Sequence, residues 1–151
     1  MSVKQSLLTA ISILFIPALV VSQQPAAPVP PPMEAGSATN EFRAAWIATV
    51  TNIDWPTKGT TDPAKQREEY IRMLDMHKKN GLNAVIAQVR PAADAFYPSP
   101  FEPWSEWLTG KQGKPPVPYY DPLQFMINEA HQRGMEFHAW LNPYRAEFSI
   151  G

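Results

Sequence analysis

The segments NAVIAQVRPAAD (83–94) and EFHAWLNPYR (136–145) decide the fold of this chain. Each contains a short apolar run, Ala84–Val89 in the first and Phe137–Leu141 in the second, and each run ends in a cluster of polar residues. Each run also follows a helix-like segment that closes on a basic residue and a glycine. A helix followed by a strand, repeated twice, is typical of a parallel sheet with helical crossovers. In such sheets ligands bind beyond the carboxyl ends of the strands, which is where these polar clusters lie.

Local signals predict a further strand and the starts of the two helices. Phe42–Val50 is nearly continuous apolar sequence, which predicts a parallel strand buried on both faces. Asp62-Pro63 and Asp121-Pro122 each place a capping aspartate before a proline at the first helical position. In the second helix, Gln124 is spaced to complete a capping box. Each helix should then end at the glycine that precedes the next strand.

These elements indicate an α/β fold. Three parallel strands with two helical crossovers match the N-terminal portion, about three βα units, of a (β/α)8 TIM-like barrel. A complete barrel of this type takes eight strands and roughly 250 residues, whereas this chain has 151. We therefore expect the chain to be an incomplete fragment of a longer protein.

The connection Pro91–Tyr120 is long for a compact domain, and connections of this length are commonly functional or disordered. Its seven aromatic residues argue against disorder. We expect an ordered loop over the carboxyl end of the sheet. Trp104 and Trp107 in this loop either attach it to the scaffold or contact a ligand, and the sequence favours neither alternative.

The first forty residues predict export rather than a folded domain. Residues 1–22 have the features of a signal peptide: a positive charge at Lys4, the apolar stretch Leu7–Val21 and small residues before a cleavage site at Gln23. A membrane anchor is the alternative, but the apolar stretch is shorter than the roughly 20 residues needed to span a bilayer. Residues 23–40 are rich in proline and predict a disordered linker, and 41–151 form the folded part. We therefore expect a periplasmic or extracellular protein with no stable membrane insertion after signal cleavage.

Composition excludes several classes of function. The net charge is −1, from 13 basic and 14 acidic residues, so no field attracts nucleic acid. The chain has no cysteine, which excludes disulfides, thiolate metal sites and cysteine nucleophiles. No H-x-H or H-E-x-x-H pattern is present, and His77 and His131 lie at predicted helix ends where a structural role is favoured. There is also no glycine-rich phosphate loop. We expect neither a metal nor a cofactor.

Polar and aromatic residues at the predicted strand ends suit a sugar. Side-chain alternation places Gln88 and Arg90 on one face of one strand, and His138, Trp140 and Asn142 on one face of the next. Arginine supplies fixed donors, whereas glutamine and asparagine supply donors and acceptors. Sugar hydroxyls need both, and the apolar faces of sugar rings stack on aromatic rings.

Further residues extend this candidate site, each with a structural alternative. Arg145 follows the last strand, and Asp54-Trp55 follows the first. The arginines could instead form rim salt bridges with Asp54 or Asp94, the latter in an auxiliary role that orients an arginine. For Trp46 on the first strand, filling the interior of the barrel is favoured over contact with a ligand.

The segments FRAAWIATVTNIDWP (42–56), QVRPAADAFYPSPFEPWSEWLTG (88–110) and YDPLQFMINEAHQRGMEFHAWLNPYR (120–145) resemble the opening of the glycosyl hydrolase-like 10 family. The resemblance implies a (β/α)8 barrel exported by bacteria that hydrolyses glycosidic bonds, with bacterial cell-wall glycan as a substrate class. It also implies that the catalytic carboxylates lie on later strands, beyond Gly151. The matching strand-end positions, which it implies bind substrate, are Asp54, Trp55, Gln88, Arg90, Asp94, Tyr97, Trp140, Asn142, Tyr144 and Arg145.

The main hypothesis is therefore an exported glycoside hydrolase whose substrate is a polysaccharide or oligosaccharide, with this fragment alone expected to be inactive. A non-catalytic glycan-binding barrel protein is the alternative from another class. A metal-dependent barrel hydrolase is a third and weaker alternative.

Overall fold

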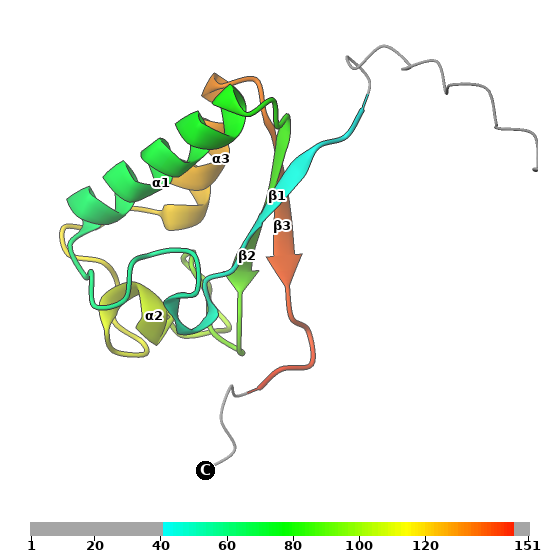
Figure 1. Ribbon diagram of the computed structural model, residues 1–151. Helices are drawn as coiled ribbons and strands as arrows, with labels where there is room; N and C mark the ends of the chain where they lie inside the picture. Colours follow the sequence, from blue (N-terminus) through cyan, green and yellow to red (C-terminus); the bar gives the residue numbers. More distant parts are fainter. Residues whose placement is uncertain (1–40, 147–151) are drawn as a thin grey trace, which may run out of the picture. The chain divides into compact units, whose positions relative to one another are not determined.

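The computed structural model describes residues 41–146, and the predicted signal peptide and linker lie outside this range. The described part is a mixed α/β structure with one parallel sheet of three strands in the order β1-β2-β3 (Figure 1). Its elements in chain order are β1 (Ala44–Ile47), the 3-10 helix η1 (Val50–Asn52), α1 (Pro63–Lys79), β2 (Ala84–Arg90), α2 (Glu106–Thr109), α3 (Pro122–Gln132) and β3 (Glu136–Leu141). The predicted alternation of helices and parallel strands is confirmed. None of the helices within residues 41–146 is long and apolar enough to cross a membrane.

Both long helices begin at the positions predicted from their capping aspartates. The Asp62 side chain accepts a hydrogen bond from the Ala64 amide at 2.9 Å, and that of Asp121 accepts from the Gln124 amide at 3.1 Å. These bonds satisfy backbone donors that have no partner inside a helix. The full capping box is not formed, because the Gln124 side chain donates to Asn128 instead.

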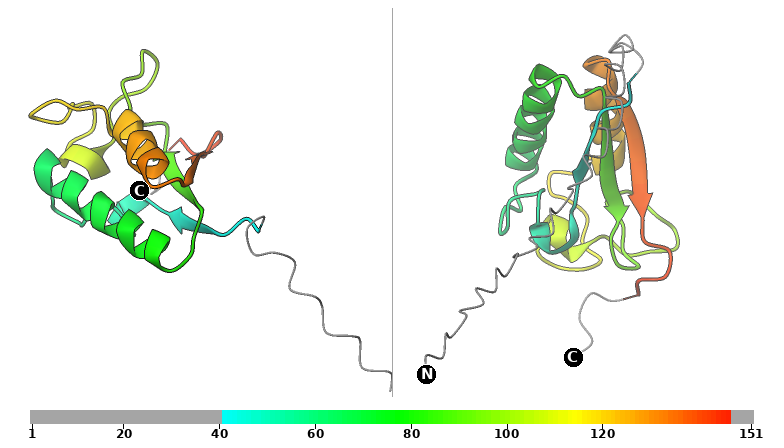
Figure 2. Two further views of the ribbon diagram at one scale, coloured as in Figure 1. Left: turned by 90° about the horizontal axis from the view of Figure 1, so that it is seen from above. Right: turned by 45° about the vertical axis from the view of Figure 1, so that its right-hand side comes forward.

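The hydrophobic core lies between one face of the sheet and the two long helices, which lie side by side on that face (Figures 1 and 2). The strands contribute alternate residues to it, as expected when one face is covered. An ion pair between Asp75 of α1 and Arg133, at 2.7 Å, also links the helices at their ends. The sheet contributes the fully buried residues Ile47, Val85, Ala87 and Val89 to this core, and the helices contribute Tyr70, Leu74, Met126 and Ala130.

The opposite face of the sheet is uncovered within residues 41–146. Trp46 of β1 is 63 % exposed and lies in register with Ile86 and His138. The prediction that the first strand is buried on both faces is therefore wrong for the described residues. That strand is also shorter than predicted, because the chain turns into η1 at Val50.

The pairing of β2 with β3 contains an irregularity at its carboxyl end. Gln88 pairs with Trp140, but Arg90 pairs with Leu141, so β2 has one residue more than β3 in this interval. Such a bulge bends the strand and re-aims the side chains beside it. Arg90, the last residue of β2, lies at this irregularity.

Candidate functional site

Arg90 connects the two loops that follow β2 and β3. Its Nε donates to Oε1 of Glu102 in the long loop after β2, and its Nη1 donates to the carbonyl oxygen of Asn142 after β3. The Arg90 and Glu102 side chains are each only 18 % exposed. Bonds between charged groups are stronger than neutral ones, so this arginine holds the loops together at the carboxyl edge of the sheet.

Asn142 extends this network in two further directions. Its Nδ2 donates to the Pro91 carbonyl at 3.0 Å, and its Oδ1 accepts from the Trp140 indole at 2.8 Å. A carbonyl can only accept and an indole N–H can only donate, so these partners determine the orientation of the amide. The Trp140 ring meets that of Trp46 edge to face, with the centroids 5.1 Å apart. The network thus fixes an indole on the uncovered face of the sheet.

Gln88 lies two residues before Arg90 in β2, and its side chain is fully buried. Its Oε1 accepts from the backbone amides of Thr49 at 3.0 Å and Val50 at 2.9 Å, and its backbone carbonyl accepts from the Thr49 hydroxyl. These bonds hold the turn at the end of β1 against β2. We therefore assign Gln88 to positioning the rim, because its side chain is inaccessible in this structure.

Three residues other than glycine adopt left-handed backbone conformations in the segments after β1 and β2. Thr51 and Asn52, both in η1, have positive φ angles of 53° and 57°, and Ala93, in the loop after β2, has a φ of 50°. Such conformations are unfavourable for residues other than glycine and persist where surrounding contacts enforce them. One such contact is the bond from the Asn52 side chain to the Trp107 carbonyl at 2.7 Å. Strain of this kind occurs often at ligand sites.

Trp55 is a core residue in the structure and not a rim residue. Its side chain is fully buried, its Nε1 donates to the Gln66 carbonyl at 2.8 Å, and its ring packs against Tyr70 and Phe96. The expectation that Trp55 presents a stacking face is therefore corrected. The loop after η1 turns inward under α1, and the large indole fills the interior.

The two predicted aspartates are separate from the Arg90 network. Asp94 is buried in the long loop, where its Oδ1 accepts from the Ala92 amide at 2.9 Å. Burial raises the pKa of Asp94 above its ordinary value, although the Ser105 hydroxyl and the Ala92 amide oppose that shift. The alternative in which Arg90 forms a rim salt bridge with Asp54 or Asp94 is not observed, because Arg90 pairs with Glu102 instead.

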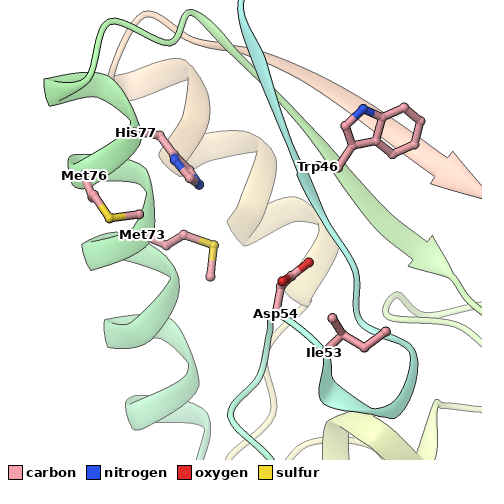
Figure 3. Close-up of a pocket in the computed structure, with 6 residues that line it drawn as sticks. All are labelled: Trp46, Ile53, Asp54, Met73, Met76 and His77. Carbon is pink, nitrogen blue, oxygen red and sulfur yellow. The ribbon is translucent and has the colours of Figure 1, made fainter.

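Asp54 instead lies in a groove between α1 and the outer edge of β1. Its Oδ2 accepts from the Ala48 amide at 2.7 Å and so covers a backbone donor at the free edge of the sheet. The groove has a volume of about 290 Å³, and Figure 3 shows Met73 and His77 extending into it from α1. Burial lowers the pKa of His77, which favours its neutral form.

The remaining predicted residues lie around the network. The Tyr97 hydroxyl donates to Oε2 of Glu102 at 3.5 Å. Partial burial, followed by the negative charge of Glu102, raises the pKa of Tyr97. Tyr144 and Arg145 are exposed on the segment after β3. Trp104 and Trp107, left open above, both pack against the core and so attach the long loop to the scaffold.

Glu102 is the residue that the sequence analysis missed. It lies between prolines 100 and 103 in the long loop, twelve positions after Arg90. A lone acidic residue within a proline-bounded aromatic turn was the available signal. Among residues 41–146 the structure brings no three histidine, aspartate or glutamate side chains close enough to hold a metal ion.

Comparison with known proteins assigns the chain to a family. The model of a family described as Glycosyl hydrolase-like 10 matches residues 41–150. The chain belongs to this family. As a Glycosyl hydrolase-like 10 member it is similar to glycosyl hydrolase YngK of Bacillus subtilis (strain 168), with 57 % identity over 115 residues that make up 76 % of this chain and 22 % of that protein. It is also similar to glycosyl hydrolase DigH of Escherichia coli (strain K12), with 43 % identity over 122 residues, 76 % of this chain and 27 % of that protein.

The Glycosyl hydrolase-like 10 chain therefore spans about a quarter of the length of these relatives. Its described residues bring five of the ten predicted site residues to one place: Gln88, Arg90, Tyr97, Trp140 and Asn142. Trp55, Asp94 and Asp54 lie elsewhere, in the core, in the base of the long loop and at the outer edge of β1.

Proposed function

We propose that the full-length protein is an exported glycoside hydrolase that acts on a polysaccharide of the bacterial cell wall. In this proposal residues 41–151 are the N-terminal portion of a (β/α)8 barrel, and the catalytic carboxylates lie beyond Gly151. Family membership supports the glycosidase class, and the relatives carry the name glycosyl hydrolase. The parallel sheet with helices on one face is compatible with part of such a barrel.

The observation that carries the substrate-binding part of the proposal is the bridge made by Arg90. It joins two loops at the carboxyl ends of adjacent parallel strands, which is where barrel enzymes bind substrates. The bridge uses Nε and one Nη1 hydrogen, so other donors of the guanidinium have no partner among residues 41–146. These donors suit the hydroxyl groups of a sugar, and the ring of Trp140, whose N–H is bonded to Asn142, suits the apolar face of a sugar ring.

Hydrolysis of a glycosidic bond needs two carboxyl groups about 5 to 9.5 Å apart. Three carboxylates in the loops after β1 and β2 already accept hydrogen bonds: Glu102 from Arg90, Asp94 from the Ala92 amide and Asp54 from the Ala48 amide. We therefore assign none of them as the catalytic acid or base. Their engagement also suits the alternative function, a non-catalytic glycan-binding barrel protein.

One experiment separates the two functions. Purified full-length protein is incubated with isolated cell-wall glycan, and both retention on the insoluble material and release of new reducing ends are measured. A hydrolase releases reducing ends in proportion to time. Retention without release would establish the glycan-binding protein instead. If the protein is not retained and releases no reducing ends, the proposal is overturned.

Export is tested separately. N-terminal sequencing of the protein recovered outside the cytoplasm should yield a chain that begins at or near Gln23. Recovery of intact Met1 in a membrane fraction would contradict signal cleavage and favour the anchor.

A further inference from the structure

Arg90 and Glu102 neutralise each other at the point where the loops after β2 and β3 meet. Arg90 Nε donates to Oε1 of Glu102, and each side chain is 18 % exposed. Partial burial strengthens the attraction between the two charges, because less water screens it. A ligand that approaches Arg90 therefore meets an ion pair and not an isolated positive charge.

Glu102 is held in place because the turn that carries it is closed at its base. The Ala95 amide donates to the Pro103 carbonyl at 2.9 Å, and the Ser105 amide donates to the Ala95 carbonyl at 3.0 Å. Inside the turn, the Ser99 hydroxyl oxygen accepts from the Glu102 amide at 3.2 Å. These bonds fix the backbone of Glu102, so a ligand that displaces its carboxylate must also disturb the turn.

The second carboxylate oxygen of Glu102 accepts a hydrogen bond from Tyr97, whose hydroxyl lies 3.5 Å away. Partial burial raises the pKa of Tyr97, the negative charge of Glu102 raises it further, and the positive charge of Arg90 opposes both. Of the two charges, that of Glu102 has the larger effect at this hydroxyl. The side of the pair that faces Tyr97 therefore offers no net positive charge to a ligand.

We propose that Glu102 is a specificity-determining residue, which restricts the subsite at Arg90 to neutral sugars by excluding sugar carboxylates. This inference rests on the proposed function and specifies the class of sugar at one position of its substrate. A sugar hydroxyl or acetamido oxygen can accept from the Arg90 hydrogens that have no partner among residues 41–146. A sugar carboxylate would share the guanidinium with Glu102, and the repulsion between the two carboxylates grows as water is excluded.

Two oligomers that differ only in charge test this selectivity in the full-length protein. One is the tetramer of β-1,4-linked N-acetylglucosamine. The other is the same tetramer with every primary hydroxyl group oxidised to a carboxylate, so that no register of binding places a neutral sugar at Arg90. Calorimetry should show that the wild type binds the neutral tetramer about tenfold more tightly than the carboxylate tetramer.

Two substitutions at Glu102 separate its charge from its hydrogen bond. Glu102→Gln keeps an acceptor for Arg90 Nε but removes the negative charge. It should raise affinity for the carboxylate tetramer by about tenfold and change affinity for the neutral tetramer by less than about threefold. Glu102→Asp keeps the charge and should retain the wild-type preference.

Glu129→Gln is the matched control. Glu129 pairs with Arg133 at 2.6 Å, and each side chain is 17 % exposed, so this substitution removes the same charge from a pair of nearly the same burial. The control pair lies at the end of α3 that precedes β3, whereas Arg90 is the last residue of β2. Affinities for both tetramers should be unchanged in this variant.

The outcomes distinguish the inference from the proposed function. Wild-type protein that binds both tetramers equally, or prefers the carboxylate tetramer, would overturn the selectivity while leaving the proposed function intact. So would a wild-type preference in Glu102→Gln, or equal changes in Glu102→Gln and Glu129→Gln, because the effect would then be absent or one of net charge. Failure of the wild type to bind either tetramer or cell-wall glycan would overturn the proposed function and the inference together.

Discussion

The guanidinium of Arg90 and the carboxylate of Glu102 form an ion pair in which each side chain is 18 % exposed. The pair joins the last residue of β2 to a turn twelve residues later. Through Nη1 the same guanidinium reaches the backbone after β3. The pair is therefore a structural support for the rim and also places unused donors at the edge where a substrate would bind.

Removing the Glu102 carboxylate should destabilise the full-length protein. Glu102→Ala leaves a half-buried guanidinium without its charged partner, at a cost of about 1.5–3 kcal/mol. Glu102→Gln keeps an acceptor for Arg90 Nε and should lose less. Thermal unfolding of the two variants checks this order. Equal melting temperatures for wild type and Glu102→Ala would show that the pair contributes nothing to stability.

Replacing Gln88 should lower the stability of the protein, because its side-chain oxygen accepts two buried hydrogen bonds. Gln88→Met keeps the volume but leaves the buried amides of Thr49 and Val50 without an acceptor, and we expect a loss of about 2–4 kcal/mol. The control Thr49→Val removes only the hydroxyl bond and should cost about 1 kcal/mol. Chemical denaturation gives both values. A Thr49→Val loss as large as that of Gln88→Met would contradict this account.

Trp55 should affect stability rather than glycan affinity. Trp55→Phe removes the bond to the Gln66 carbonyl and part of the buried ring, which should cost about 2–4 kcal/mol. The protein that remains folded should bind glycan within about twofold of wild type, less than the loss of a single hydrogen bond. A large loss of affinity with an unchanged melting temperature would show that Trp55 contacts the substrate.

The buried Asp94 carboxyl predicts a pH-dependent effect. Because burial raises its pKa in the folded state, ionisation of Asp94 costs more in the folded protein than in the unfolded chain. This carboxyl therefore lowers stability at neutral pH. Asp94→Asn keeps an oxygen for the Ala92 amide and should be more stable than wild type near pH 7.

The advantage of Asp94→Asn should shrink as the pH falls through the folded-state pKa and vanish below about pH 4, where aspartate is protonated in both states. Melting temperatures of both proteins across this range provide the measurement. An advantage that grows toward acid pH would have the wrong sign and would exclude the burial effect.

A polypeptide restricted to residues 41–151 should not behave as a cooperative domain. The uncovered sheet face exposes Phe42 and Trp46, and β1 and β3 are both edge strands of the described sheet. Such faces and edges promote association, so we expect strong binding of a hydrophobic dye and aggregation on concentration. A monomer with a sharp two-state thermal transition would refute this expectation.

The local elements could be predicted because their signals act over a few residues. Asp62 and Asp121 begin helices, since a carboxylate reaches a backbone amide two or three positions away. The apolar runs at 84–89 and 137–141 form parallel strands that pair with each other, as their pattern predicted. Family membership follows from longer motifs of the same segments.

The site could be predicted only in part, because its contacts join residues that are distant in the chain. Alternation predicted which residues of each strand share a face, but it contained no sign of the register that pairs Gln88 with Trp140 or of the irregularity that pairs Arg90 with Leu141. The partner of Arg90 depended on the path of a thirty-residue connection. That path also decided that Asp94 is buried at the base of the loop.

By itself, then, the sequence determined the order of helices and parallel strands, the helix starts and the edge of the sheet where polar residues gather. Only the tertiary structure decided that Trp55 fills the core and that Glu102 is the partner of Arg90. The physical reason is range: caps and alternation depend on neighbours along the chain, whereas burial and ion pairing depend on which distant segments meet when the loops pack over the strand ends.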